Sequence, residues 1–362
     1  MNTVARELSG GIMAVTRDSS AKSAGIGQKI EFPIVPDAGL RDVKPSTVSP
    51  NVNGEEIKSR VLEITKSKAG DIVWTGNEQE SLGDEMYQSI LQDQITERMR
   101  AIINEVEADI MAVAVAEAKD KLTVADPFST DLKALTQVYK TLQDKGAPRS
   151  SLQGVLNTTA SMNLRNLNQL QKVNEAGTPS LLRQGVLGNL MGFDIRETCA
   201  MPQSEADSSG GNDYLVNGNA KKGDYVIHID TGTKVINKGA SVSFGSDYKY
   251  AVADDVASGS TELHLVSPLQ EDVADNTTVT VTNNVANTCV FFPRSAIWLA
   301  TRTIPEPQGG DMAVARRTIT DPQTGLSFGV SLYPGYKQNH IEISMSWGVG
   351  IVKPEFVIPV IG

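Results

Sequence analysis

The longest uninterrupted apolar pattern in the chain is DEMYQSILQDQITERMRAIINEVEADIMAVAVAEAKDKLTV, residues 84–124. Apolar residues recur in it every three or four positions, as on one face of an α-helix: Leu91, Ile95, Met99, Ile102, Val106, Ile110 and Val113. Neither glycine nor proline interrupts the stretch, so it predicts a single helix about 50–60 Å long. The stripe has a mean period of about 3.7 residues, which favours a straight helix lying against a sheet over a coiled coil.

The residues before this helix are predicted to form an arm and a β excursion. Residues 1–28 are small, polar and weakly patterned, which is typical of an extended arm that is ordered only when something holds it. Residues 29–76 contain three strand-like segments, KIEFPIV, IKSRVLEITKS and DIVWT, with a turn predicted at Gly70-Asp71. This excursion has few residues for a core of its own.

The residues after the helix alternate between helical and strand patterns. We expect a helix over about 130–145, a short buried strand at LQGVLN, and a further helix that begins at Thr158 or Thr159. The segment GVLGNLMGFDIRETCAMP, residues 185–202, then places three glycines before a predicted strand: Gly185, Gly188 and Gly192. A dinucleotide-binding loop needs G-x-G-x-x-G between a strand and a helix, and this spacing differs. Each glycine is therefore predicted to allow a positive φ or close packing at a tight reversal.

A compositional change marks an inserted domain. QSEADSSGGND resembles a linker, and short strands separated by turn residues follow over about 212–285, which predicts a small barrel or sandwich. Ser204 to Thr288 hold 12 acidic and 5 basic residues, or −7 of the chain's net charge of −10. The segment is therefore predicted to be a distinct, solvent-facing β domain.

The C-terminal part returns to a mixed pattern. VFFPRSAIWLATRT is predicted to be a strand that enters a short helix. In HIEISMSWGVGIV, apolar residues such as Met345 and Trp347 alternate with small or polar ones, which predicts a half-buried antiparallel strand. The tail KPEFVIPVIG, which contains Phe356, is apolar to its last residue. A free apolar end would be costly, so we expect it to pack against a neighbouring molecule.

No combination of residues in the sequence predicts catalysis, a cofactor or a metal. The three histidines, His228, His264 and His340, occupy alternating positions of predicted strands. There is no phosphate-binding G-x-x-x-x-G-K-[ST] and no G-x-S-x-G. The acidic net charge disfavours a dedicated nucleic-acid binder, and no apolar run approaches the ~20 residues that span a membrane. Without a recognisable signal peptide, the protein is expected to be made in a cytoplasm.

Two segments resemble a known family. GVLGNLMGFDIRETCAMP, residues 185–202, resembles the turn-and-strand segment of tailed-bacteriophage major capsid proteins, and FFPRSAIWLAT, residues 291–301, resembles their strand-to-helix segment. The order of arm, β excursion, long helix, mixed domain and β return is similar to that of the Hong Kong 97 fold. GASVSFG, GSTELHLVSP and WGVGIVKPE resemble segments of the P-twenty-two kind of coat protein, which carries an inserted β-barrel.

The resemblance implies an α+β fold of the Hong Kong 97 type with an inserted small all-β barrel. Its parts would be an N-terminal arm (1–28), an E-loop (29–76), a peripheral domain with a spine helix (77–121), an axial domain (122–202), the inserted domain (203–288), and a return to the axial and peripheral domains (289–362).

The resemblance also implies a function as a non-enzymatic major capsid protein, which forms an icosahedral shell around the dsDNA genome of a tailed bacteriophage. The expected partners are other copies of the chain in hexamers and pentamers, a scaffolding protein, a portal protein, packaged dsDNA without sequence-specific contacts, and decoration proteins. The expected location is the virion capsid, with the host cytoplasm during assembly. No cofactor and no membrane are expected.

The residues expected to serve assembly or packing are Leu91, Ile95, Met99, Ile102, Val106, Ile110, Gly185, Gly188, Gly192, Trp347 and Phe356. Two alternatives remain open. An encapsulin-like protein compartment would share the fold, but the inserted β domain counts against it. A secreted β-rich binding protein belongs to another class, and the long helix and the missing signal peptide count against it.

Overall fold

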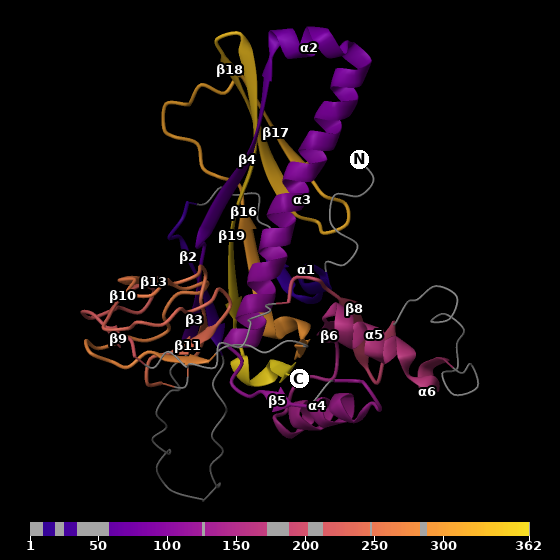
Figure 1. The fold of residues 1–362 in the computed structure, drawn as a ribbon, viewed down its shortest axis with the longest axis vertical. Coiled ribbons are helices and arrows are strands. Elements are labelled where there is room, and N and C mark those ends of the chain that lie inside the picture. Colours follow the sequence, from indigo (N-terminus) through magenta and orange to yellow (C-terminus); the bar gives the residue numbers. More distant parts are fainter. Residues whose placement is uncertain are drawn as a thin grey trace, which may run out of the picture.

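A long helix packed against a six-stranded sheet dominates the fold (Figure 1). The computed structural model describes residues 10–18, 25–34, 58–124, 127–171, 188–201, 213–246, 248–282 and 288–361. Helix α3 (Asp84–Ala116) has 33 residues and contacts strands β19 and β4 of this sheet. The helix predicted by the apolar stripe is therefore present, although it ends at Ala116 and not at the end of the uninterrupted stretch 84–124. A short helix, α2 (Gly76–Leu82), precedes it, and Gly83 with a φ of 72° separates the two.

The six-stranded sheet is mostly antiparallel. Its order is β1 (Thr16–Asp18), β16 (Ile297–Arg302), β19 (Gln338–Ile351), β18 (Ser327–Gly335) and β17 (Ala315–Thr320), and β4 (Lys66–Thr75) also pairs with β19. Only β1 joins in parallel to its neighbour, β16, among the described strands of this sheet. Within the predicted arm, helix α1 (Gly10–Ala14) packs on α3 and β1 pairs with β16, so both are held by the rest of the chain.

Strand β4 corrects the prediction of a turn at Gly70-Asp71. The strand runs without a break from Lys66 to Thr75, and all of it pairs with β19. The strand pattern is interrupted earlier, where two residues separate the end of β3 (Lys58–Glu63) from the start of β4. Strand β3 forms an antiparallel pair with β2 (Lys29–Ile34). A Cβ at Gly70 would lie 3.1 Å from the side chain of Arg98 on α3. Glycine therefore serves close packing of the strand on the helix at this position, not a reversal.

Strand β19 is buried more fully than its alternating pattern predicts. Ile343, Met345 and Trp347 face the core as expected, but Ser344 and Ser346 on the opposite face are buried as well. A Cβ at Gly348 would lie 2.0 Å from the carbonyl oxygen of Glu63. The small residues on this face let the end of β3 approach closely, and the prediction of a half-buried strand was wrong for this half.

A second six-stranded sheet lies beside the C-terminal end of α3. Its order is β5 (Leu122–Thr123), β20 (Ile358–Ile361), β15 (Cys289–Pro293), β6 (Leu152–Leu156), β8 (Phe193–Glu197) and β7 (Asn189–Leu190). Helices α4 (Lys133–Asp144), α5 (Thr158–Asn166) and α6 (Asn168–Gln171) accompany it, and the short buried strand LQGVLN is present as β6.

The C-terminal tail belongs to this second sheet. Strand β20 pairs with β15 on one side and β5 on the other, and Val357, Ile358 and Val360 are buried within the chain itself. The prediction that the tail packs against a neighbouring molecule was therefore wrong, because the chain supplies its own cover. The predicted helix after VFFP is also absent: one 3-10 turn, η1 (Arg294–Ala296), leads directly into β16.

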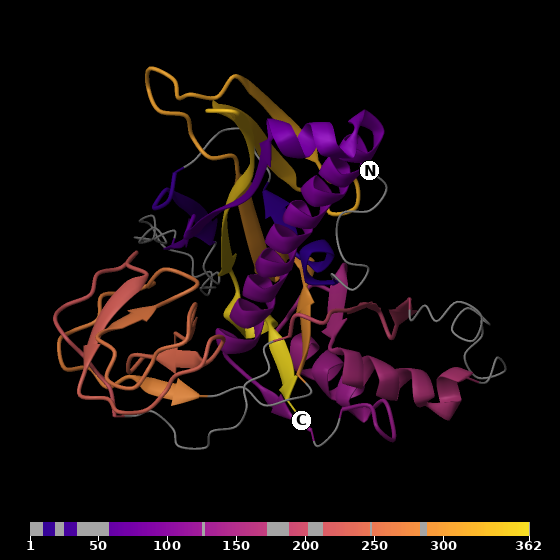
Figure 2. The same cartoon turned by 45° about the horizontal axis from the view of Figure 1, so that its top comes forward.

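Residues 213–282 form a separate β unit with an apolar core of its own (Figure 2). Six short strands make two three-stranded sheets: β9 (Leu215–Val216), β10 (Val226–Asp230) and β13 (Glu262–His264), and β11 (Ser241–Ser243), β12 (Tyr250–Ala251) and β14 (Thr280–Thr282). Isolated bridges such as Ile236 to Val256 supplement these ladders. The predicted strand KVIN contributes only such a bridge.

Candidate functional site

The apolar stripe of α3 is packed inside the chain. Met99, Ile102, Val106 and Ile110 are buried in the main apolar cluster, and Leu91 and Ile95 are partly buried against it. Trp347 of β19 is buried in the same cluster, and so is Phe356, which follows the strand. The six stripe positions, Trp347 and Phe356 therefore serve packing of the single chain, and a role in assembly stays a prediction.

Two buried side chains, Asp109 and Trp347, and the partly buried Lys66 link α3 to the sheet. Lys66 on β4 lies 3.0 Å from a carboxylate oxygen of Asp109, and the indole N–H of Trp347 donates to the other oxygen at 3.0 Å. Burial opposes the charge on Lys66, but Asp109 and Glu105 outweigh that effect and raise its pKa. The ion pair sets the register between helix and sheet, because Asp109 without Lys66 would be a buried charge with no cation beside it.

A second buried carboxylate holds the N-terminal segment. Glu107 accepts hydrogen bonds from the backbone N–H groups of Gly11 (2.6 Å) and Ile12 (2.8 Å) and from the hydroxyl of Thr198 (2.8 Å). Burial raises its pKa, and the three hydrogen bonds partly offset the rise. A Cβ at Gly11 would lie 2.4 Å from the methyl group of Met111, so only glycine fits this slot as it stands.

Sequence reasoning overlooked Glu107 and Asp109, although a signal for them exists. Both interrupt the most apolar part of the helix, in NEVEADIMAVAVA, where a carboxylate has no exposed face to occupy. Charged residues are rarely buried without a partner. Two carboxylates in such a stretch therefore predict specific buried hydrogen bonds.

The glycine-rich turn behaves as predicted where the structure describes it. Met191 and Gly192 have φ values of 50° and 85° and join β7 to β8 in a two-residue hairpin. Two successive residues with positive φ are typical of a type I′ turn, whose twist suits a hairpin. Gly188, with a φ of 60°, begins the hairpin, while Gly185 lies outside the described residues.

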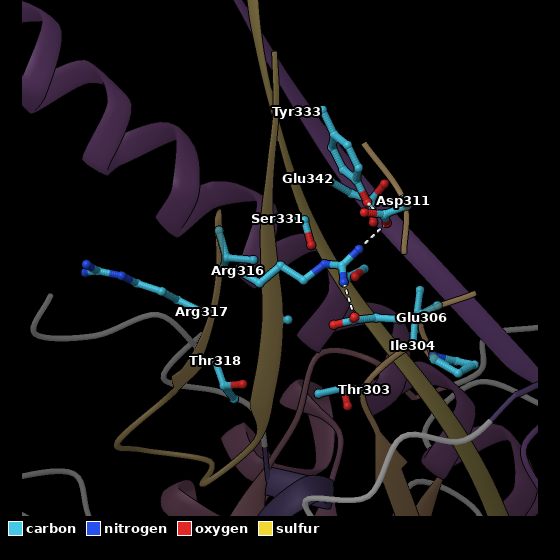
Figure 3. Close-up of a pocket in the computed structure, with 14 residues that line it drawn as sticks. Thr303, Ile304, Glu306, Asp311, Arg316, Arg317, Thr318, Ser331, Tyr333 and Glu342 are labelled. Atoms are coloured by element: carbon cyan, nitrogen blue, oxygen red, sulfur yellow. Dashed lines mark hydrogen bonds and ion pairs between the residues drawn. The ribbon is translucent and has the colours of Figure 1, made fainter. Parts of the chain in front are cut away.

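The outer face of the first sheet, opposite α3, carries polar residues in register. Arg316, Ser331, Glu342 and Asp71 are paired across β17, β18, β19 and β4, so they share this face. A cavity of about 290 Å³ lies there, beneath the loop that joins β16 to β17 (Figure 3). We call this surface, with its loop, the outer face.

Ion pairs hold the β16–β17 loop, residues 303–314, over the cavity. The guanidinium of Arg316 contacts the carboxylates of Glu306 and Asp311, and the hydroxyl of Tyr333 donates to Asp311 at 3.1 Å (Figure 3). The backbone N–H of Ala313, the Tyr333 hydroxyl and Arg316 together lower the pKa of Asp311. These interactions hold the loop on the outer side of β17 and β18.

Several large apolar side chains are exposed on and around the outer face. They are Val73, Ile304, Met312, Val314 and Tyr336, and Tyr336 at the β18–β19 hairpin is 89% exposed. Exposed apolar side chains that lie near one another favour a surface that contacts other proteins. The outer face is therefore the candidate contact surface of the chain.

The described residues contain no group of three His, Cys, Asp or Glu side chains placed to hold a metal ion. His340 lies 2.9 Å from Asp71 on the outer face, and His228 and His264 lie beside Glu262 on the β unit. Within the part of the chain that the structure describes, no helix combines the length and apolarity needed to span a bilayer.

Solved structures, in contrast to sequences, match the chain over its whole length. No protein-family model matches the sequence, and no curated protein matches it. A chain from the capsid of the cyanophage P-SCSP1u matches with a TM-score of 0.51 and 12% identity, over 96% of this chain and 86% of that one. The present chain therefore has the fold of a capsid subunit. A chain from the capsid of a native GTA particle matches with a TM-score of 0.50 and 9% identity, over 100% of this chain and 92% of that one.

The similarity to the two capsid chains extends over the whole fold. In both matches the alignment takes in nearly all of this chain, so the long helix, the two sheets and the β unit are compared together and not one by one. At such low identity the similarity concerns the fold alone, and the role of each side chain must be argued from its own contacts.

Proposed function

We propose that the chain is a major capsid protein that self-assembles into the icosahedral shell around the dsDNA genome of a tailed bacteriophage. The observation that carries the proposal is the capsid fold, matched along nearly the entire chain in two independent capsid structures. The exposed apolar side chains of the outer face support it, because a shell subunit needs surfaces that other copies cover.

Within this proposal the parts of the chain take the roles of a Hong Kong 97-type subunit. Helix α3 would be the spine of the peripheral domain, the second sheet would form the axial domain, and the β2–β3 pair would be the base of the E-loop. The β unit of residues 213–282 would be the inserted barrel domain of a P-twenty-two-like subunit. Two three-stranded sheets around a common apolar core support that role.

Charge supports an outward position for the inserted domain. The segment from Ser204 to Thr288 carries −7 of the total charge of −10, so the rest of the chain is only weakly acidic. A strongly acidic inner lining would repel packaged DNA. The proposed partners are a scaffolding protein, a portal protein, the packaged dsDNA and decoration proteins, and the proposed location is the virion capsid.

Particle formation tests the proposal. The chain is expressed with and without the remaining structural proteins of its virus, and the products are separated by sedimentation and viewed by negative-stain electron microscopy. We expect closed shells of uniform size that hold DNA in the virus. Shells that enclose protein cargo would indicate a compartment, and a chain that stays monomeric in all conditions would overturn the proposal.

A further inference from the structure

The β unit is joined to the body at the C-terminal end of α3. The hydroxyl of Ser241 donates to the carbonyl of Ala116 at 2.6 Å, and the hydroxyl of Thr65 donates to the carbonyl of Val266 at 3.2 Å. Gln270 reaches the carbonyl of Val61 at 3.3 Å. We call the two six-stranded sheets with their helices and the β2–β3 pair the body. The joint is the contact of its residues 61–65 and 116–119 with residues 241–270 of the β unit.

A buried carboxyl group lies at the centre of the joint. Glu117 caps the C-terminal end of α3, where its backbone N–H bonds to the carbonyl of Val113, and the whole residue is only 7% exposed. Its side chain points to the β unit, where the hydroxyl of Ser267 donates to it, and the backbone of Ala251 also contacts it. The C-terminal end of a helix carries partial negative charge, which disfavours an ionised carboxylate at this position.

The groups around Glu117 compensate its charge only in part. Arg60 on β3 attracts it, but the guanidinium also lies 5.1 Å from the ring centre of Tyr248. Tyr250 on β12 faces it with a hydroxyl that accepts from the backbone N–H of Gln270, and burial raises the pKa of this hydroxyl.

A second carboxyl group of the joint is also buried. Glu63 ends β3 and is 3% exposed, and within the described residues its Oε2 atom has no hydrogen-bond partner. Burial raises its pKa, Lys29 opposes the rise, and Asp224 of the β unit adds to it. Because burial disfavours the charged form of both carboxyl groups, the docking of the β unit on the body favours their protonation.

We propose that the joint is a proton-operated coupling, in which a neutral Glu117 allows the β unit to dock on the spine helix and its ionisation loosens the docking. The inference concerns the free chain, so it stands or falls independently of the shell function. In a shell it would let one subunit hold its β unit firmly or loosely according to pH.

The direction of the effect follows from the sign of the shift. Burial raises the pKa of Glu117 to about 7 from 4.5, and the hydrogen bond from Ser267 and the charge of Arg60 oppose the rise. A raised pKa means that the docked state holds its proton more tightly than the undocked one. Docking is therefore strongest below pH about 4.5, weakens as the pH rises, and has lost this contribution above pH about 7.

Hydrogen exchange tests the coupling on the purified, unassembled full chain at pH 5.5 and pH 8.5, after correction for the intrinsic exchange rates. In the wild type we expect amides of residues 239–253 and 265–270 to lose protection at least about tenfold at the higher pH, and the core of α3 to change little. Glu117→Gln should lose most of this difference between the two pH values, because a neutral amide cannot ionise and only the smaller contribution of Glu63 remains. Glu97→Gln, at an exposed position of the same helix, should behave like the wild type.

Ser267→Ala offers a second readout if the glutamine variant folds poorly. Removing a hydrogen bond to the carboxylate should shift the midpoint of the exchange transition to higher pH. Equal protection of the joint at both pH values in the wild type would overturn the proposal. A pH response that persists unchanged in Glu117→Gln would overturn it as well.

Discussion

The identity of several residues in this protein is explained by the backbone and side-chain groups that they contact, or by the backbone conformation that they adopt. Glu107 is a carboxylate in an apolar helix because the first turn of α1 presents two backbone N–H groups to it. Gly348 is a glycine because the end of β3 crosses the strand at this point. Gly192 has open space around its Cβ position, so its requirement comes from the backbone alone.

Glu107→Ala should destabilise the chain by about 3 kcal/mol or more, because it leaves two buried N–H donors and the Thr198 hydroxyl without an acceptor. Urea unfolding followed by circular dichroism measures the loss, and limited proteolysis should show earlier cleavage near residues 10–18. Glu97→Ala is the matched control on the exposed side of α3 and should change stability by less than about 0.5 kcal/mol. Equal losses in the two variants would contradict the role given to Glu107.

Gly192→Val should cost about 1–2 kcal/mol, because a side chain there must adopt the left-handed conformation that the φ of 85° requires. Gly192→Asn should cost less, since asparagine visits this conformation more readily. Thermal unfolding of the two variants separates them. If valine and asparagine were tolerated equally, the positive φ would not be the reason for the glycine.

At the scale of elements, helix α3 is the part on which the others depend. Its stripe meets β4 and β19, its Asp109 and Glu107 fix the sheet and the N-terminal segment, and its C-terminal end receives the β unit. The first sheet has no complete core without this helix. A defect in the middle of the stripe should therefore act on the whole body.

Ile102→Asp should destabilise the chain by more than about 4 kcal/mol, because it places a carboxylate with no partner in the apolar contact between helix and sheet. We expect insoluble or unassembled protein, measured by the soluble fraction and by sedimentation. Ala101→Asp, one residue away on the exposed side of the helix, should remain soluble and assemble. Normal particles from Ile102→Asp would argue against the packing role of the stripe.

At the scale of the whole molecule, the chain has two apolar cores. One runs through both six-stranded sheets and helices α1, α3 and α4, and the other lies wholly within residues 214–281. The two meet at the joint, where Ala251, Ala253 and Val266 of the β unit pack on the core of the body and hydroxyl groups and buried acids add specific links. Under the proposed coupling, we expect the β unit to respond to pH while the body stays folded.

The segment 211–285 expressed alone should fold, because most of its buried apolar residues form a cluster of their own and only Ala251, Ala253 and Val266 pack on the core of the body. Dispersed amide signals in an NMR spectrum and a cooperative thermal transition are the expected results. Val242→Asp, which places a charge in that core, is the control and should abolish both. A disordered wild-type segment would show that the body supplies part of the core.

The turn around Gly192 and the stripe of α3 could be predicted from sequence because their causes are local. A positive φ calls for glycine, and a period near 3.6 residues marks a helix face, whatever the rest of the chain does. The predictions for Gly70, the C-terminal tail and the polar face of β19 were wrong for a common reason. In each case the outcome depended on a partner distant in sequence: Arg98 for Gly70, β15 and β5 for the tail, and the end of β3 for Gly348.

The sequence by itself determined the long helix, the mixed α+β character and the presence of an acidic segment of β structure, since periodicity and composition are properties of neighbouring residues. Only the tertiary structure decided which groups meet: Glu107 with the N-terminal segment, Asp109 with Lys66 and Trp347, and Glu117 with the β unit. The physical reason is that a buried charge is stable only beside its partners, and those partners come from strands and turns that the linear order of residues does not bring together.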